Sequence, residues 1–240
     1  MRKVFKKKYL KTYFVLLFLG LLIFGAMFYL KFVTNVNNKE NKKETADDIR
    51  VAAVGDSITY DSYSVARQGE FYPEQLEELL GDGYVVHNFG VSNYAAQSSS
   101  DFPYETTKEF QESLDFQPNI VIIMLGTNDT KVTNWDGSEQ FKEEYSDLLA
   151  NYQTLSSVSR IILASPPKAF LEGEVFSGAI DPNVVVNIRD AVEEVADEFD
   201  LEFVDVYEKT SRHPEYFPDG IHPDENGAAV LAKLFYRQIK

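Results

Sequence analysis

The chain has 240 residues, with 23 Lys and Arg, 38 Asp and Glu, and no cysteine. The lack of cysteine excludes disulfides, thiolate metal sites and a cysteine nucleophile. Residues 1–50 hold 11 Lys and Arg but 4 Asp and Glu, so the remainder is strongly acidic, which argues against a nucleic-acid partner.

Residues 1–11 form a basic tail, and residues 12–30 carry no charge. Nineteen residues of helix extend roughly 28 Å, close to the thickness of a bilayer core. This pattern predicts one N-terminal transmembrane helix that anchors the protein in a membrane. A cleaved signal peptide is the alternative, but no convincing small-residue cleavage site stands around residues 25–28.

The balance of charge around this stretch predicts its orientation. Six basic residues precede it, and Lys31, Lys39, Lys42 and Lys43 follow it. The excess on the N-terminal side favours an inside N-terminus, so we expect the rest of the chain to lie outside the cytoplasm. Residues 31–48 are polar and predict a flexible tether, and residues 49–240 are expected to form the domain.

Short apolar runs alternate with amphipathic segments through the domain. The runs are rich in Val and Ile and predict strands at Ile49–Val54, Tyr84–Phe89, Asn119–Leu125, Arg160–Ala164 and Leu201–Val206. Helices are predicted over Pro73–Leu80, residues 104–116, Ser138–Leu155, Asp181–Phe199 and Asn226–Ile239. We expect Ser138 to cap the third helix, and Asp181 before Pro182 to open the fourth. This alternation predicts an α/β domain whose parallel sheet is covered on both faces.

Residues that can carry chemistry follow the first three strands. Ser57 stands in Gly55-Asp56-Ser57, Gly90 ends the second strand, and Asn128 stands in Gly126-Thr127-Asn128-Asp129. Taken singly, each is as well explained by a turn or a helix cap. Together they offer a nucleophile, a backbone N–H and a side-chain amide at the sheet edge where ligands bind.

Asp219 and His222 stand three residues apart near the C-terminal end. In a tight turn the carboxylate can accept from Nδ1 of the ring, which leaves Nε2 to act as a base. His87 lies inside a predicted strand and is expected to be a packed residue, and His213 precedes Pro214 with no carboxylate at the spacing that Asp219 has from His222. Three scattered histidines without cysteine predict no metal site and no other cofactor.

The four motifs are those of Ser57, Gly90, Asn128 and the pair Asp219 and His222. In this order along the chain, they resemble the motifs of the SGNH/GDSL hydrolase family, over residues 49–240. The resemblance implies a flavodoxin-like three-layer α/β/α fold with a five-stranded parallel sheet. It implies Ser57, His222 and Asp219 as the catalytic triad, and Ser57, Gly90 and Asn128 as oxyanion-hole donors, while Asp56 and Asp129 are expected only to order their loops. The family often has a second glycine three residues after Gly90, where this chain has Asn93, and asparagine tolerates the left-handed conformation.

These features predict a serine esterase for small acyl esters, with acetyl groups on a glycan as the expected substrate. The strand and helix units leave little chain for a lipase lid. Aromatic residues that can stack on sugars stand beside the motifs: Tyr60, Tyr63, Tyr94, Trp135, Tyr216 and Phe217. Acyl transfer to a sugar hydroxyl, and lysophospholipid or thioester hydrolysis, stay open. A non-catalytic binding module is disfavoured because every motif residue is intact.

Overall fold

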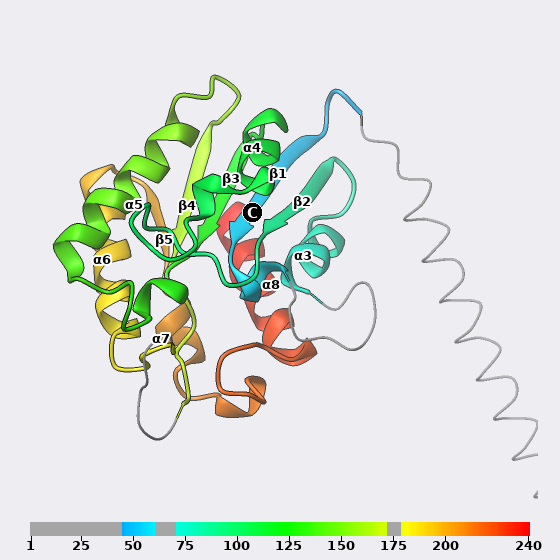
Figure 1. Cartoon of the computed structure of the whole chain (residues 1–240). Coiled ribbons are helices and arrows are strands. Elements are labelled where there is room, and N and C mark those ends of the chain that lie inside the picture. Colours follow the sequence, from blue (N-terminus) through cyan, green and yellow to red (C-terminus); the bar gives the residue numbers. More distant parts are fainter. Residues whose placement is uncertain (1–44, 61–70, 172–178) are drawn as a thin grey trace, which may run out of the picture. The chain divides into compact units, whose positions relative to one another are not determined.

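The computed structural model describes residues 45–60, 71–171 and 179–240 (Figure 1). The chain divides into two units, Met1–Ala46 and Asp47–Lys240, and the strands and helices below belong to the second. The predicted tail at 1–11, the anchor at 12–30 and most of the tether at 31–48 lie outside the described residues. Over the described ranges, no helix is long and apolar enough to cross a membrane. The anchor and its orientation therefore stay predictions.

A five-stranded sheet forms the centre of the second unit. Its strands are β1 (Ile49–Gly55), β2 (Tyr84–Gly90), β3 (Ile120–Met124), β4 (Arg160–Ala164) and β5 (Glu202–Val204). The order is β2-β1-β3-β4-β5 and every neighbouring pair is parallel. The predicted parallel α/β sheet is confirmed, and its strand order is that of the flavodoxin-like folds.

Alternate residues of each strand face opposite layers, which is why both faces of the sheet are apolar. In β1, Val51 and Ala53 belong to one core cluster, and Ala52 and Val54 belong to the other. The face with Val51 and Ala53 is covered by helices α3 (Tyr72–Leu80) and α8 (Glu225–Ile239). The face with Ala52 and Val54 is covered by helices α4 (Lys108–Asp115), α5 (Ser138–Gln153) and α6 (Val185–Glu198). Figure 1 shows these layers on either side of the strands.

Three predicted helix starts differ from the structure. Residues 104–116 divide into a 3-10 turn (Tyr104–Thr106) and α4, because Thr107 is extended and its side chain caps Phe110 N–H. Ser138 is the first residue of α5 and makes no capping bond, since the N-cap is Gly137. Asp181 accepts from the N–H of Asn183 in a turn, so α6 begins only at Val185.

Two short helices stand outside the five helices predicted above. Helix α2 (Ser57–Tyr60) follows β1 directly, and α7 (Val206–Thr210) follows β5. The fifth strand was predicted to reach Val206, but the Asp205 side chain accepts from Glu208 N–H and starts α7 there. The strand is therefore only three residues long.

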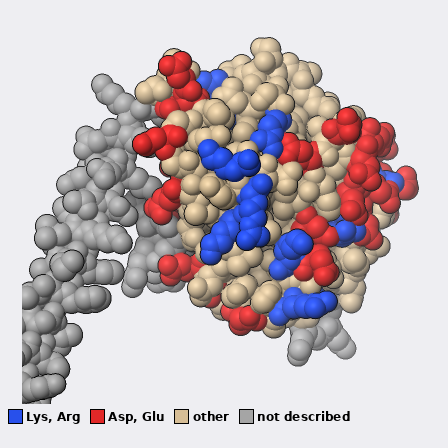
Figure 2. Space-filling view, turned by 180° about the vertical axis from the view of Figure 1, so that it is seen from behind, with Lys and Arg blue, Asp and Glu red and all other residues tan. Residues whose placement is uncertain are grey.

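The acidic charge of the domain is unevenly distributed over its surface. On the face opposite that of Figure 1, Lys and Arg side chains gather in the middle and Asp and Glu lie toward the rim (Figure 2). The net charge therefore disfavours polyanionic partners in general, and it does not describe every part of the surface.

We predict that a protein shortened to begin at Ala46 folds, stays soluble and keeps the activity of the full chain. The reason is that the strands, helices and candidate site lie in the unit that starts at Asp47. Circular dichroism, sedimentation and kcat/KM of both proteins measure this. An aggregated or unfolded product would show that the N-terminal residues pack on the domain.

Candidate functional site

Ser57 lies at the carboxyl end of β1, next to the ends of β2 and β3. From β1 the chain goes first to β2 on one side and then to β3 on the other side. Parallel sheets bind their ligands at such a switch point. Asp56 orders the turn: its carboxylate accepts from Ile58 N–H at 2.9 Å, and its carbonyl accepts from Thr59 and Tyr60. Burial raises the pKa of Asp56, against the hydrogen bond from Ile58. Asp56 thus orders the loop, as the sequence analysis expected.

Two glycines let this turn lie close to the neighbouring strands. A Cβ on Gly55 would collide with the Thr59 side chain and lie 2.8 Å from the Met124 carbonyl oxygen. A Cβ on Gly90 would collide with the backbone nitrogen of Tyr60. The Asn88 side chain adds a bond from Nδ2 to the Thr59 carbonyl at 2.8 Å. The serine turn is therefore held against β2 and β3 together.

The structure brings Ser57, His222 and Asp219 into one hydrogen-bonded chain. Nε2 of His222 lies 2.9 Å from Oγ of Ser57, and Nδ1 lies 2.6 Å from Oδ2 of Asp219. Oδ1 of Asp219 accepts from the N–H groups of Ile221 at 2.9 Å and His222 at 2.7 Å. Ser57 is largely buried, with 8% of its surface exposed. This geometry suits transfer of the Ser57 proton to the ring.

The carboxylate of Asp219 is stabilised in its charged form. Burial opposes ionisation, but the bonds from the His222 ring and from the N–H groups of His222 and Ile221 outweigh it, so the pKa of Asp219 lies below its usual value. An ionised Asp219 fixes the orientation of the ring and stabilises an imidazolium.

The predicted oxyanion donors differ in their availability. Asn128 is 5% exposed, and one hydrogen of its amide is donated to the Tyr94 carbonyl at 2.9 Å, which leaves the second for a ligand. The N–H of Gly90 donates to Oδ1 of Asn88 at 2.9 Å. The role of Gly90 stays a prediction, and it requires this bond to open.

Asn93 takes the left-handed conformation that the sequence analysis allowed for it, with φ 76°. Among the described residues, neither the N–H of Asn93 nor that of Ser57 meets a hydrogen-bond acceptor. The loop that carries Asn93 is bound to Asn128 through the Tyr94 carbonyl. Sequence reasoning noticed Asn93 as a departure from the family pattern and did not predict its unpaired N–H.

Asp129 binds the same loop a few residues beyond Asn93. Its carboxylate accepts from the N–H groups of Ala96 at 3.0 Å and Gln97 at 2.9 Å. This is the ordering role that the sequence analysis expected for it. Burial raises the pKa of Asp129 to about 7, against these two hydrogen bonds.

The other two histidines have separate surroundings. His87 stacks on Phe116 with ring centroids 4.3 Å apart, and Nδ1 of His213 lies 3.0 Å from Oε1 of Glu215. Over the described ranges, no three His, Asp or Glu side chains meet as ligands of a metal would.

The predicted sugar-stacking aromatics are partly corrected. Tyr60 is 54% exposed, but Phe217 is 3% exposed and packs on Phe170. Trp135 packs against the core beside Phe141, and Tyr63 lies outside the described residues. Phe102 was not predicted, yet it is 44% exposed and its ring contacts that of Tyr94.

Comparisons with known proteins agree with this fold and point to an ester hydrolase. The GDSL-like Lipase/Acylhydrolase family model matches residues 53–230. An acetylxylan esterase from Xylanibacter ruminicola is 31% identical over 213 residues, which cover 81% of this chain but 44% of that protein, so this chain spans less than half the length of that relative.

Solved structures show the same fold. A carbohydrate acetylesterase from Sinorhizobium meliloti has a TM-score of 0.62 at 18% identity, and an aryl esterase from M. smegmatis has 0.62 at 20%. Each match covers 80% of this chain and 98% of the other.

Asp129 and Asp219 are expected to affect stability in opposite pH ranges. The raised pKa of Asp129 means that the folded chain keeps a proton that the unfolded chain loses near pH 4. Its contribution to the free energy of unfolding therefore falls as pH rises from about 4 to about 7, by at most about 1.4 kcal/mol per pH unit. Asp129→Asn should reduce this slope, and Asp56, whose pKa is also raised, accounts for a remainder of the same sign.

Asp219→Asn is the matched control. The lowered pKa of Asp219 gives stability that is present above about pH 4 and is lost only as pH falls further, so this variant should change the profile below that value. Urea unfolding at several pH values measures both. An unchanged slope from pH 4 to 7 in Asp129→Asn would contradict the assignment.

Proposed function

Because the chain belongs to the GDSL-like lipase/acylhydrolase family of ester hydrolases, we propose that its domain is a serine esterase that removes small acyl groups, acetyl foremost, from carbohydrate. The observation that carries this proposal is the hydrogen-bonded chain from Asp219 through His222 to Ser57. The acetyl group and the carbohydrate are supported by the similarity to an acetylxylan esterase.

In the proposed mechanism, His222 Nε2 takes the proton of Ser57 Oγ as this oxygen attacks the ester carbonyl. Asp219 holds the ring in the tautomer that this step needs. The tetrahedral intermediate then expels the alcohol, which takes the proton from His222. Water attacks the acyl-serine in the same way, releases the acid and restores Ser57.

We assign the oxyanion to three donors. Two are the N–H of Ser57 and the second amide hydrogen of Asn128. The third is the N–H of Asn93, because this group is unpaired whereas that of Gly90 is bonded to Asn88. Donors fixed before the reaction stabilise developing charge without reorganisation, which is the largest single contribution in many such enzymes.

Two exposed rings near the site support a sugar as the alcohol. Tyr60 ends the helix that Ser57 begins, and Phe102 contacts the residue whose carbonyl binds Asn128. Aromatic rings of this kind stack on the apolar face of a sugar. The predicted outside location agrees with a cell-surface glycan, and it stays a prediction that rests on the charges of residues 1–43.

The test of the substrate is acetate release from acetylated xylo-oligosaccharides, together with a series of esters from acetyl to octanoyl. We expect kcat/KM to fall as the acyl chain lengthens. A value that climbs toward octanoyl would favour a lipid substrate instead. Acyl transfer to added xylose in place of acetate release would identify a transferase.

Ser57→Ala serves as the blank in these assays. Its turnover should fall by about 10⁴ or more, with an unchanged circular dichroism spectrum. His222→Ala should be similarly inactive, while His87→Ala and His213→Ala, which alter rings with other partners, should stay active.

For the oxyanion hole, we predict that Asn128→Ala lowers kcat by about 10² to 10³ and leaves KM nearly unchanged. A crystal structure of the enzyme phosphonylated on Ser57 identifies the remaining donors. The phosphonyl oxygen should lie about 2.7–3.1 Å from the nitrogen of Asn93. If it lies instead on Gly90, with the bond to Asn88 broken, the donor inferred from the sequence is the right one.

A further inference from the structure

Lys131 is a buried cation that the proposed reaction does not use. It follows the 3-10 turn Asn128–Thr130, and in the part of the chain that the structure describes no other Lys or Arg is buried. The side chain is 5% exposed, and Nζ lies 3.2 Å from Oδ2 of Asp101. Burying a charge is costly unless it is paired and hydrogen-bonded, so the contacts that Nζ makes are the ones to examine.

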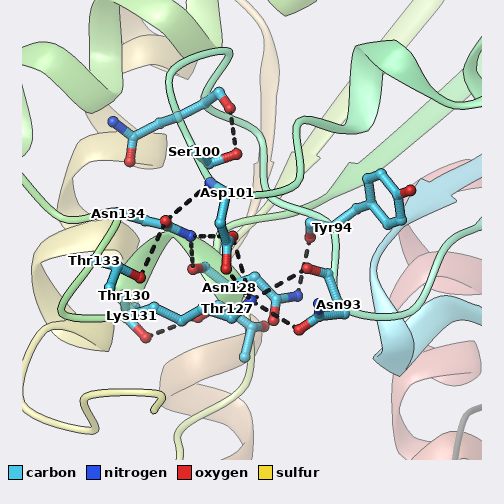
Figure 3. Close-up of polar contacts among 11 residues, drawn as sticks. Asn93, Tyr94, Ser100, Asp101, Thr127, Asn128, Thr130, Lys131, Thr133 and Asn134 are labelled. Atoms are coloured by element: carbon cyan, nitrogen blue, oxygen red, sulfur yellow. Dashed lines mark hydrogen bonds and ion pairs between the residues drawn. The ribbon is translucent and has the colours of Figure 1, made fainter. Parts of the chain in front are cut away.

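The ammonium of Lys131 holds Asn93 at two points. Nζ donates to the Asn93 side-chain oxygen at 2.8 Å and contacts the Asn93 carbonyl at 3.4 Å (Figure 3). Asparagine tolerates a left-handed conformation better than most residues with a Cβ, but the conformation still costs on the order of 1 kcal/mol unless contacts in the surroundings offset it. The bonds from Lys131 are such contacts, at the residue whose N–H is assigned to the oxyanion.

Lys131 also belongs to a hydrogen-bond network that includes Asn128. Asn134 Nδ2 donates to Asp101 Oδ1 at 2.8 Å and to the Asn128 carbonyl at 3.0 Å, and Asn134 Oδ1 accepts from Asp101 N–H at 3.1 Å. Asn128 in turn donates to Tyr94, the neighbour of Asn93. Figure 3 shows these side chains converging between the loop after β2 and the segment after β3.

The ammonium of Lys131 already has its own partners. Its Nζ is occupied by Asn93 and Asp101, and the Phe102 ring lies over it with the centroid 5.5 Å away. We propose that Lys131 is a positioning residue of the esterase. Its hydrogen bonds to Asn93 hold the Asn93 N–H so that this group and the Asn128 amide donate to the same oxyanion. The inference rests on the proposed function and adds a residue to it.

The test is a double-mutant cycle of Lys131→Met and Asn93→Gly, assayed with p-nitrophenyl acetate and with a fluorophosphonate that labels Ser57. Lys131→Met should lower kcat and the labelling rate by about 10- to 100-fold, as for donors displaced by about 1 Å, and change KM less than about 3-fold. Glycine adopts positive φ without a Cβ penalty, so in the Asn93→Gly background the same change should cost less than about 3-fold.

Lys142→Met is the matched control, because Lys142 pairs with Glu139 and Glu194 on the surface and should have no effect on either rate. If Lys131→Met fails to fold, Lys131→Met with Asp101→Asn removes both charges and should show the same loss. Equal losses of kcat on Lys131→Met in the wild-type and Asn93→Gly backgrounds would overturn the positioning role, since a purely structural lysine would have the same effect in both. Labelling of Ser57 in the wild type shows whether the serine is reactive. This measurement does not depend on whether the substrate is a carbohydrate, so it separates failure of the positioning role from failure of the carbohydrate assignment.

Discussion

The contact between the first turn after β1 and the end of β2 is the constraint on which the candidate site depends. A side chain at Gly90 would meet the backbone of Tyr60, and one at Gly55 would meet Thr59 and the end of β3. Three strand ends are thereby packed at one point. Because the turn cannot shift relative to either neighbour, Ser57 has one position, and the loops that leave β2 and β3 begin beside it. The serine is thus fixed by backbone packing, and its polar partners are aligned to it.

The hydrophobic pattern predicts the fold well because both faces of a parallel sheet must be covered. The β4 run was predicted with its observed bounds, and the other strands differ by a few residues at their ends. The errors lie where a local polar bond competes with the pattern. Thr107 divides a predicted helix by capping its second half, and Asp205 ends a strand by capping α7. Such bonds depend on single side chains, which apolar periodicity does not register.

The triad and Asn128 could be predicted because each belongs to a short motif beside a strand. The left-handed conformation of Asn93 could be expected from its residue type, but its unpaired N–H could not, since that depends on the loops around it. Lys131 and its partner Asp101 could not be found at all. They are 30 positions apart, and their contact exists only because the loop after β2 lies across the segment after β3. A buried network of this kind is a product of tertiary packing, and no spacing in the sequence marks it.

Ser57 and His222 lie 165 positions apart, on the first turn of the domain and just before its final helix. Helix α8 packs on the same face of the sheet as α3, and Asp219 and His222 stand on the turn that precedes α8. A molecule in which this end of the domain is not docked would hold Ser57 without its proposed base. The proposed esterase would therefore be inert until both ends of the domain have met.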